Sequence, residues 1–384
     1  PFDLAPKQTV SGRALPLAQA LSRRGHSVRL IVPCWGRPSA SDRCSELQGV
    51  QLKYVRSPRL SGPLSHGFIA WRLLWAALAD HPDVVHCFKP IGYSGAVAGC
   101  VWLMKRLPMA RVRLVVDTDD WEGYGGWADR NRPGSAVRRF VAWQERRGLV
   151  HCDAVTAASR TLENLAKALG HRCVHYLPNG LHALPALPTR SRARFRLGLD
   201  QGPVALVYTR FVEVTPAHLG SILTDLLRRA PDLRVLLVGE GFGDEVERIR
   251  RYLAGRSEGR RIQVTGWVER DELSWYWAAA DFALYACEDD LLNRAKSPLR
   301  LVEMLGAGLP VVAHGVGAVN EYVEDGVSGV VVAPGDDEGF VAAAVRMCER
   351  VDERLEFGRQ ARERIGHHFL WDSLSARAEL AYTL

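Results

Sequence analysis

The chain has 384 residues, 47% of them hydrophobic and 24% charged, which is the composition of a folded globular protein and excludes a disordered chain. This length favours two domains, and no apolar run approaches the roughly 18 residues that a membrane span needs. The net charge of +7 is divided unevenly, because residues 1–180 carry +12 and residues 181–384 carry −5. The basic half has no aromatic stacking motif, so we expect no nucleic-acid partner.

The eight cysteines are scattered along the chain, without a C-x-x-C pair or a zinc-finger spacing. Cysteines of this kind are typical of small buried residues in a reducing compartment. The sequence also shows no basic and apolar leader at its start. We therefore expect a cytoplasmic protein without disulfide bonds and without a bound metal.

In chain order, short apolar strands alternate with helices. A helix is expected over 14–24, where apolar residues follow helical spacing and Gly25 marks the stop. Another helix is expected over 67–79, where Arg72 is the one charged residue. We interpret it as facing the core, with contact to a membrane surface as the alternative. Strands are expected over 27–32, 83–88, 113–117 and 154–158.

The same rhythm restarts after a proline-rich stretch over 178–188. The later strands are expected over 204–208, 235–238, 262–264, 282–285, 310–313 and 329–332. Strand–helix alternation predicts parallel sheets, and hence an α/β fold of two Rossmann-like domains. We place them at 1–182 and 183–368, followed by a tail helix over 369–384. Ligands of such sheets bind where the strands end, so we expect loops of both domains to face a cleft.

The most informative segment runs from Lys296 into a short helix and on to a buried strand. Ser297 suits the N-cap of that helix, and Pro298 suits its first position. Free backbone N–H groups at the helix N-terminus and the positive end of the helix dipole favour a phosphate, so we assign Ser297, Pro298 and Leu299 to the donor site. Lys296 is the only lysine after residue 167, and Glu303 lies within reach of a ribose. The alternative is an ordinary capped helix with a solvated Lys and Glu.

This segment resembles the nucleotide-sugar site of the family-four glycosyltransferases, whose fold is called GT-B. The resemblance continues in order along about 370 residues, and any one motif alone is weak. Its other motifs are Ser11-Gly12-Arg13, Leu177-Pro178-Asn179-Gly180, Val207-Tyr208-Thr209-Arg210, Leu236-Leu237-Val238-Gly239, Val264-Thr265-Gly266-Trp267-Val268, and Glu321 through Gly329. The first strand expected before Ser11 is missing from the sequence.

The resemblance implies two Rossmann-like domains, a last helix that crosses back to the first domain, and retaining, metal-independent transfer from a nucleotide-diphosphate sugar. The sugar nucleotide is then a co-substrate, and no cofactor is expected. By resemblance, Glu303 binds the ribose, the backbone of Val268 meets the base, and Arg210 meets the diphosphate. Gly12 approaches the diphosphate from the first domain, and Gly239 belongs to the donor site. We assign Arg210 and Lys296 a catalytic role in stabilising the leaving group.

Three positions depart from the family pattern. Ala295 stands where the family often has Glu, Thr215 where it has Lys, and Asp119 where it has His. These departures leave two alternatives open. One is a protein of this fold that binds nucleotide sugars without transferring them, and the other is an epimerase of nucleotide sugars.

Four carboxylates crowd into residues 117–122, directly after a predicted strand. One interpretation is a site that orients the acceptor hydroxyl, with Asp119 or Asp120 as base. A second is the D-x-D metal motif of the GT-A glycosyltransferases. A third is an acidic loop paired with the neighbouring arginines, which are Arg130, Arg132, Arg138 and Arg139.

The acceptor is expected on the basic first domain. We assign acceptor binding to Arg13, His86, Trp121 and Glu122, with a structural role as the alternative for His86. Excess positive charge favours an anionic or lipid-linked acceptor, and contact with the inner membrane surface.

Overall fold

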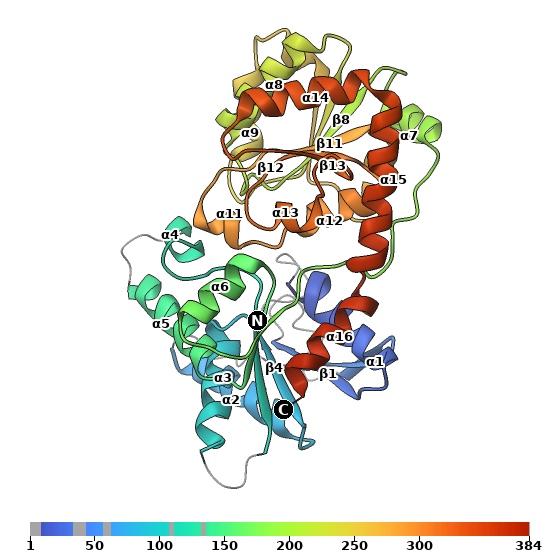
Figure 1. The fold of residues 1–384 in the computed structure, drawn as a ribbon. Helices are drawn as coiled ribbons and strands as arrows, with labels where there is room; N and C mark the ends of the chain where they lie inside the picture. Colours follow the sequence, from blue (N-terminus) through green and yellow to red (C-terminus); the bar gives the residue numbers. More distant parts are fainter. Residues whose placement is uncertain (1–8, 34–43, 57–62, 107–110, 132–135, 384) are drawn as a thin grey trace. The chain divides into compact units, whose positions relative to one another are not determined.

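The computed structural model describes residues 9–33, 44–56, 63–106, 111–131 and 136–383 (Figure 1). The chain divides into two compact units. The first unit comprises 1–182, 295–297 and 371–384, and the second comprises 183–294 and 298–370. The segment before Thr9, on which the expectation about the first strand depends, lies outside the described residues.

The first unit contains two sheets. One has the order β1-β3-β2, and the other is a parallel sheet with the order β4-β5-β6-β7. β1 pairs with β3 in parallel, whereas β2 and β3 are antiparallel. The strands are β1 (Val28–Pro33), β2 (Cys44–Leu47), β3 (Val50–Val55), β4 (Val84–Phe88), β5 (Arg113–Thr118), β6 (Ala154–Ala157) and β7 (Val174–Tyr176).

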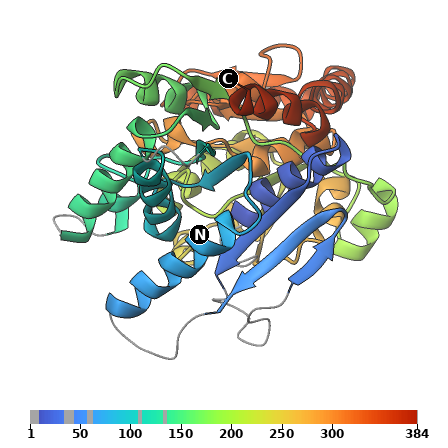
Figure 2. The same cartoon turned by 90° about the horizontal axis from the view of Figure 1, so that it is seen from below.

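Helices cover both faces of the β4–β7 sheet. The helices of this unit are η1 (Val10–Ala14), α1 (Leu15–Arg23), α2 (Pro63–Leu78), α3 (Gly92–Met104), α4 (Trp127–Asn131), α5 (Ala136–Val150), α6 (Arg160–Ala168) and α16 (Trp371–Tyr382). Figures 1 and 2 show α2, α3 and α5 along one side and α16 on the other. The alternation of β5 explains this: Leu114 and Val116 join one core, and Val115 faces α16 at Ala381.

The second unit is built on one parallel sheet with the order β10-β9-β8-β11-β12-β13. Its strands are β8 (Val204–Tyr208), β9 (Arg234–Val238), β10 (Ile262–Gly266), β11 (Phe282–Tyr285), β12 (Val311–His314) and β13 (Gly329–Val332). Its helices are α7 (Arg190–Leu197), α8 (Pro216–Arg229), α9 (Glu245–Leu253), η3 (Glu258–Arg261), α10 (Leu273–Ala279), α11 (Leu291–Ala295), α12 (Leu299–Gly306), α13 (Val319–Tyr322), α14 (Asp337–Glu349) and α15 (Val351–His368). Helices α8, α9 and α14 bury their apolar faces against one side of this sheet. Both units are therefore Rossmann-like α/β domains.

Local sequence explains where several helices begin. Thr215 caps α8 by accepting from the His218 amide, and Pro216 is the first helical residue. Ser159 caps α6 at Leu162, and Asp336 caps α14 at Gly339. Within the described ranges, no helix is long and apolar enough to cross a membrane.

Two expectations about local structure are wrong. Residues 10–14 form a π-helix that runs directly into α1, so Gly12 lies buried in a helix rather than in an open glycine loop. Helix α12 begins at Leu299, and its N-cap is Pro298 rather than Ser297. The reason is that Ser297 is engaged elsewhere: its hydroxyl accepts from the Asn179 amide at 2.9 Å.

Candidate functional site

Three predicted donor residues follow adjacent parallel strands of the second unit. Arg210 follows β8, Gly239 follows β9, and the half-buried Val268 follows β10. The carboxyl ends of parallel neighbours share one edge of a sheet, which is where open α/β sheets bind ligands. Gly239 has φ +122°, and a Cβ there would stand 1.8 Å from the Thr209 carbonyl oxygen. Any larger residue would push apart the two loops that carry this edge.

Arg210 has a partly buried guanidinium group whose hydrogen-bonding capacity is not fully used by the described residues. Its side chain is half-buried, and its guanidinium lies over the Phe242 ring at 4.3 Å. Its Nε is buried and has no hydrogen-bond partner among the described residues. Burial lowers the pKa of this guanidinium, and Arg300 adds to the lowering. A partly desolvated cation with an unsatisfied donor suits an anionic ligand.

Glu303 lies on α12 of the second unit, and its side chain is buried. Its Oε1 lies 3.1 Å from Nη2 of Arg270, an exposed side chain in the loop after β10. Burial raises the pKa of Glu303, and Arg270 and Arg300 oppose this rise. Arg300 also lies 3.5 Å from Glu213 and over the Tyr208 ring. The buried carboxylate of α12 therefore lies among two guanidinium groups, that of Arg270 in the loop after β10 and that of Arg300 in the helix itself. Its N-cap, Pro298, offers no side-chain cap.

Lys296 and Ser297 pack with the first unit, although the helix that follows them belongs to the second. The Lys296 ammonium lies 5.8 Å from the centre of the Trp127 ring, and its side chain is largely buried. Asn179 of the predicted interdomain turn donates to the Ser297 carbonyl at 2.7 Å and contacts its hydroxyl. The turn at Asn179 thus fixes the backbone directly before α12.

Two departures from the family pattern have structural roles. Ala295 is buried against Ala157, Ala158 and Leu162 in an apolar cluster. Thr215 caps α8, and its own amide donates to Glu288. Neither position supplies charge to the site.

In the first unit, Lys89 gathers the carboxylates that follow β5. Its Nζ lies 2.8 Å from Asp120, 2.9 Å from Glu122 and 3.2 Å from Asp119. The three carboxylates outweigh the effect of burial and hold the pKa of Lys89 well above its ordinary value. Lys89 has φ +62°, a conformation that side chains rarely adopt and that is often found at functional sites. Lys89 directly follows β4 and precedes Pro90. This position at the end of a strand could have marked it as a candidate site residue from the sequence, and it was missed.

Lys89 is thus a partner of Asp119, Asp120 and Glu122 that the expected pairing with arginines did not include. Arg138 pairs with Asp129 and lies over Tyr124 instead. Arg132 lies outside the described residues. Burial raises the pKa of Asp119 to about 6, with Lys89 opposing the rise. Oδ1 of Asp119 is buried and makes no hydrogen bond among the described residues.

A buried glutamate holds the backbone of the same loop. Glu145 of α5 accepts from the amides of Glu122 and Gly123, each at 2.8 Å. Burial raises the pKa of Glu145 to about 8, and the two amides oppose this. Trp121 is half-buried, and its indole N–H donates to the Tyr124 carbonyl at 2.7 Å. The loop is thus preorganised, with Asp120 and Glu122 turned toward Lys89.

Arg13 and Asp117 form a buried ion pair, so the expectation that Arg13 binds the acceptor is wrong. Arg13 Nε and Nη2 lie 2.8 and 2.6 Å from the two carboxylate oxygens of Asp117. The guanidinium also donates to the Leu177 carbonyl and to Asn179. With a side chain 2% exposed, Arg13 has no surface to offer a ligand. Asp117 also accepts from Thr156, which leaves it unsuited to the D-x-D metal motif. Among the described residues, no three His, Cys, Asp or Glu side chains gather as a metal site requires.

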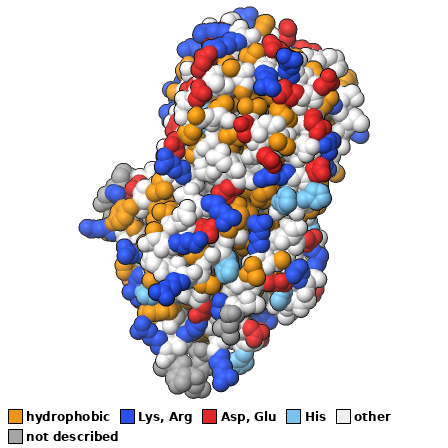
Figure 3. Space-filling model, in the orientation of Figure 1, with side chains coloured by type: hydrophobic (Ala, Val, Ile, Leu, Met, Phe, Trp, Pro, Cys, Tyr) orange, Lys and Arg blue, Asp and Glu red, His pale blue; other side chains and the backbone are white. Residues whose placement is uncertain are grey.

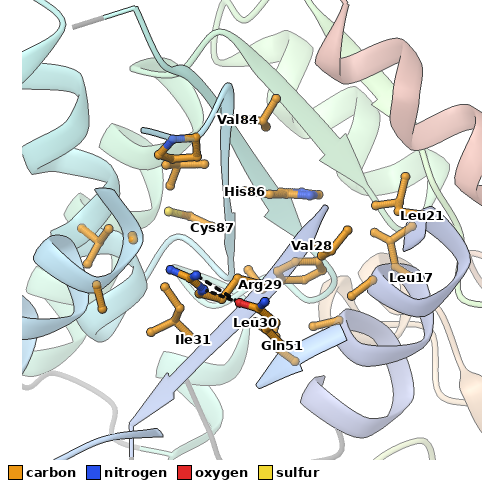
Figure 4. Close-up of a pocket in the computed structure, with 18 of the residues that line it drawn as sticks. Leu17, Leu21, Val28, Arg29, Leu30, Ile31, Gln51, Val84, His86 and Cys87 are labelled. Carbon is orange, nitrogen blue, oxygen red and sulfur yellow. Dashed lines mark hydrogen bonds between the residues drawn. The ribbon is translucent and has the colours of Figure 1, made fainter. Parts of the chain in front are cut away.

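His86 lies in a different place from the acidic loop. It lines a pocket of about 880 Å³ between β1 and β4, each an edge strand of its sheet (Figure 4). Its Nδ1 lies 2.9 Å from the Tyr382 hydroxyl and its Nε2 3.1 Å from that of Thr156. Since Thr156 donates its one proton to Asp117, Nε2 must donate and Nδ1 must accept. Both ring nitrogens have hydrogen-bond partners within the unit, which supports the structural role given as the alternative for His86, and its contact with the acceptor stays a prediction.

The enclosure of His86 predicts a pH dependence of stability. Burial lowers its pKa from 6.5 to about 4, so between these values the unfolded chain binds a proton that the folded chain does not. Stability therefore falls as pH is lowered through this window, by about 2 kcal/mol from this residue. Urea unfolding at pH 6.5 and 4.5 should show a smaller loss in His86→Gln than in the unchanged protein. Equal losses in both proteins would show that His86 does not titrate in this way.

Comparison with known families agrees with this architecture. Residues 9–180 match the family described as "Glycosyl transferase 4-like domain", and residues 216–350 match "Glycosyl transferases group 1". The two matches together take in most of both units. The chain belongs to the group 1 glycosyltransferases, and its two Rossmann-like domains are those of the GT-B fold.

Curated relatives match nearly the whole chain. The GDP-mannose-dependent alpha-(1-6)-phosphatidylinositol monomannoside mannosyltransferase of Mycobacterium tuberculosis is 26% identical over 375 residues, which cover 94% of this chain and 90% of that protein. A glycogen synthase of the same species is 26% identical and covers 95% and 88%.

Solved structures share the fold. Sucrose-phosphate synthase from Thermosynechococcus elongatus superimposes with a TM-score of 0.73 at 19% identity, covering 98% of this chain and 92% of that one. Anabaena HepE, solved in complex with UDP and glucose, gives a TM-score of 0.71 at 18% identity, covering 100% and 98%.

Proposed function

We propose that the protein transfers a sugar from a nucleotide-diphosphate sugar to a hydroxyl group of an acceptor, with retained anomeric configuration and without a metal ion or cofactor. The observation that carries the proposal is the edge of the second sheet where Arg210 follows β8. There a partly buried guanidinium with an unsatisfied Nε stands in the same unit as the uncapped α12 N-terminus and the buried Glu303. Cations, free amides and a buried carboxylate are what a diphosphate and a ribose need.

The chemistry follows from the charge that develops during transfer. When the nucleotide diphosphate leaves, negative charge grows on its phosphate and the sugar becomes oxocarbenium-like. Arg210 and the amides at the start of α12 would stabilise that phosphate, which lowers the barrier more than a strong base would. The catalytic role assigned to Lys296 stays a prediction. The departing phosphate can take the acceptor proton if the acceptor attacks from the same face.

The carboxylates beside Lys89 are proposed to orient the acceptor hydroxyl. Lys89 donates hydrogen bonds to Asp120 and Glu122, while Oδ1 of Asp119 is buried and lies 3.2 Å from Lys89 Nζ as an ion pair. Glu145 holds the loop from behind. We propose an acceptor that is anionic or lipid-linked, which is supported by the basic first unit and by a relative named for a phosphatidylinositol mannoside.

A transfer assay tests the proposal. The protein is incubated with GDP-, UDP- and ADP-sugars and a lipid-extract or glycoside acceptor, and the product's anomeric configuration is determined by NMR. We expect one donor to be consumed only when acceptor is present, with retention. Inversion would contradict the mechanism, and a changed sugar nucleotide in the absence of acceptor would indicate an epimerase.

Replacing Glu303 tests the donor site separately. Glu303→Ala should weaken binding of the nucleotide sugar by about 10- to 100-fold, because hydrogen bonds to a charged group contribute about 1.5–3 kcal/mol. Isothermal titration measures the change, with Glu338→Ala, an exposed glutamate of the same unit, as the control. Equal affinities of Glu303→Ala and the unchanged protein would remove Glu303 from the site.

A further inference from the structure

Three helices on one side of the first unit expose large apolar side chains to solvent. Helix α2 was expected to face the core, and Ile69 and Leu73 do so. Its other stripe is exposed, however, with Trp71 at 55% and Trp75 at 62%. Among the described residues, the exposed large apolar side chains on α2, α3 and α5 are Phe68, Trp71, Trp75, Leu103, Met104, Val137, Phe140 and Trp143. We call this set the aromatic face.

The residues of the aromatic face lie on three neighbouring helices. Helix α3 packs against α2 on one flank and against α5 on the other. Figures 1 and 2 show the three helices on the same side of the β4–β7 sheet. On α2, the Trp71 and Trp75 rings contact each other edge to face, and on α5 the Phe140 and Trp143 rings stack. Exposed large apolar side chains gathered on neighbouring helices are typical of an interaction site.

The charged residues of these helices are mostly basic. Helices α2, α3 and α5 contain five arginines and one acidic residue, which is the buried Glu145. Arg139 and Arg146 are exposed and have no carboxylate partner among the described residues. Arg147 lies over the Trp102 and Trp143 rings. In Figure 3, hydrophobic side chains lie beside Lys and Arg side chains over α5.

We propose that the aromatic face binds the surface of an anionic lipid bilayer. Tryptophan and phenylalanine enter the boundary between headgroups and acyl chains, while arginines pair with anionic headgroups. The positive charge favours a membrane over a second copy of the protein as the partner of this face. Two copies of the same cationic face would repel each other, whereas an anionic membrane attracts this face. This inference does not depend on the proposed sugar transfer, although it would bring a lipid-linked acceptor to the enzyme.

Vesicle flotation with the full chain tests the proposal. We expect binding to vesicles of equal parts phosphatidylcholine and phosphatidylglycerol, with at least about tenfold weaker binding to phosphatidylcholine alone. Raising the salt concentration should weaken the binding further, because screening reduces the attraction of exposed charges. Failure to bind the anionic vesicles would overturn the proposal.

Two pairs of matched variants locate the surface. Arg139→Glu with Arg146→Glu should weaken vesicle binding about tenfold or more, and Trp71→Ala with Trp75→Ala should do the same. The controls are Arg248→Glu with Arg251→Glu, and Phe195→Ala with Leu355→Ala, which change exposed residues of the second unit. If controls and face variants lose binding equally, the face is not the site. A dimer detected by sedimentation velocity and abolished by the face variants, without vesicle binding, would assign the face to a second copy.

Discussion

Arg210→Ala is expected to lower kcat/KM of sugar transfer by about 100- to 1,000-fold, the cost of removing one preorganised group from a developing anion. The side chain lies half-buried over Phe242, and its Nε has no partner among the described residues. Burying a cation without a full set of partners costs free energy in the free protein. A bound diphosphate would supply the missing partner and stabilise the cation. Because charge grows on the phosphate during transfer, the loss should fall mainly on kcat.

A control variant separates this effect from general damage. Arg234→Ala removes a partly exposed arginine of the same sheet that pairs with Asp200, and it should leave the rate unchanged. Arg210→Lys keeps the charge but loses the planar fork, so an intermediate rate is expected. If Arg210→Ala turns over as fast as the unchanged protein, Arg210 has no part in the reaction.

Arg13→Met should reduce the free energy of unfolding by about 3–5 kcal/mol, since it leaves the carboxylate of Asp117 buried without its partner. Both oxygens of Asp117 accept from Arg13, and the side chains of the pair are 2% and 0% exposed. Urea unfolding followed by circular dichroism measures the loss. The pair also ties η1 to β5 and to the Asn179 turn, so its rupture loosens three segments together.

Two further variants test the origin of that loss. Adding Asp117→Asn to Arg13→Met removes the stranded charge and should restore part of the stability. Arg23→Met breaks the exposed pair with Asp372 and should cost less than about 1 kcal/mol. Equal losses for Arg13→Met and Arg23→Met would show that burial of the pair is not what makes it matter.

The regular elements could largely be predicted, because apolar periodicity is a local property. The strands over 113–117 and 204–208 and the helix over 14–24 lie within a few residues of β5, β8 and α1. The strands β2, β3 and β7 were not predicted. Cys44–Leu47 is exposed throughout and polar in part, so it carries no apolar signal.

The site was harder to predict because its partners are distant in sequence. Ser297 has the residue type of an N-cap, but Asn179, far away in the chain, takes its hydroxyl and moves the cap to Pro298. Lys89 neutralises carboxylates some 30 residues later, where sequence proximity pointed to arginines. Arg13 stands next to Gly12 in the Ser11-Gly12-Arg13 motif, which suggested a role in binding. Its hydrogen bonds to Asp117 and to the Leu177 carbonyl place it in the core instead. Tertiary contacts between residues far apart in the chain cannot be read from the spacing of residues in the sequence.

Calorimetric titration of the full chain with GDP-, UDP- and ADP-sugars tests the central claim most directly. We predict saturable binding of at least one nucleotide sugar at one site per chain, weakened in Arg210→Ala and Glu303→Ala and unchanged in Glu338→Ala. Absence of heat from all of the donors, with the protein folded, would contradict the assignment of the second unit as a donor site. Equal binding by all of these variants would contradict it as well.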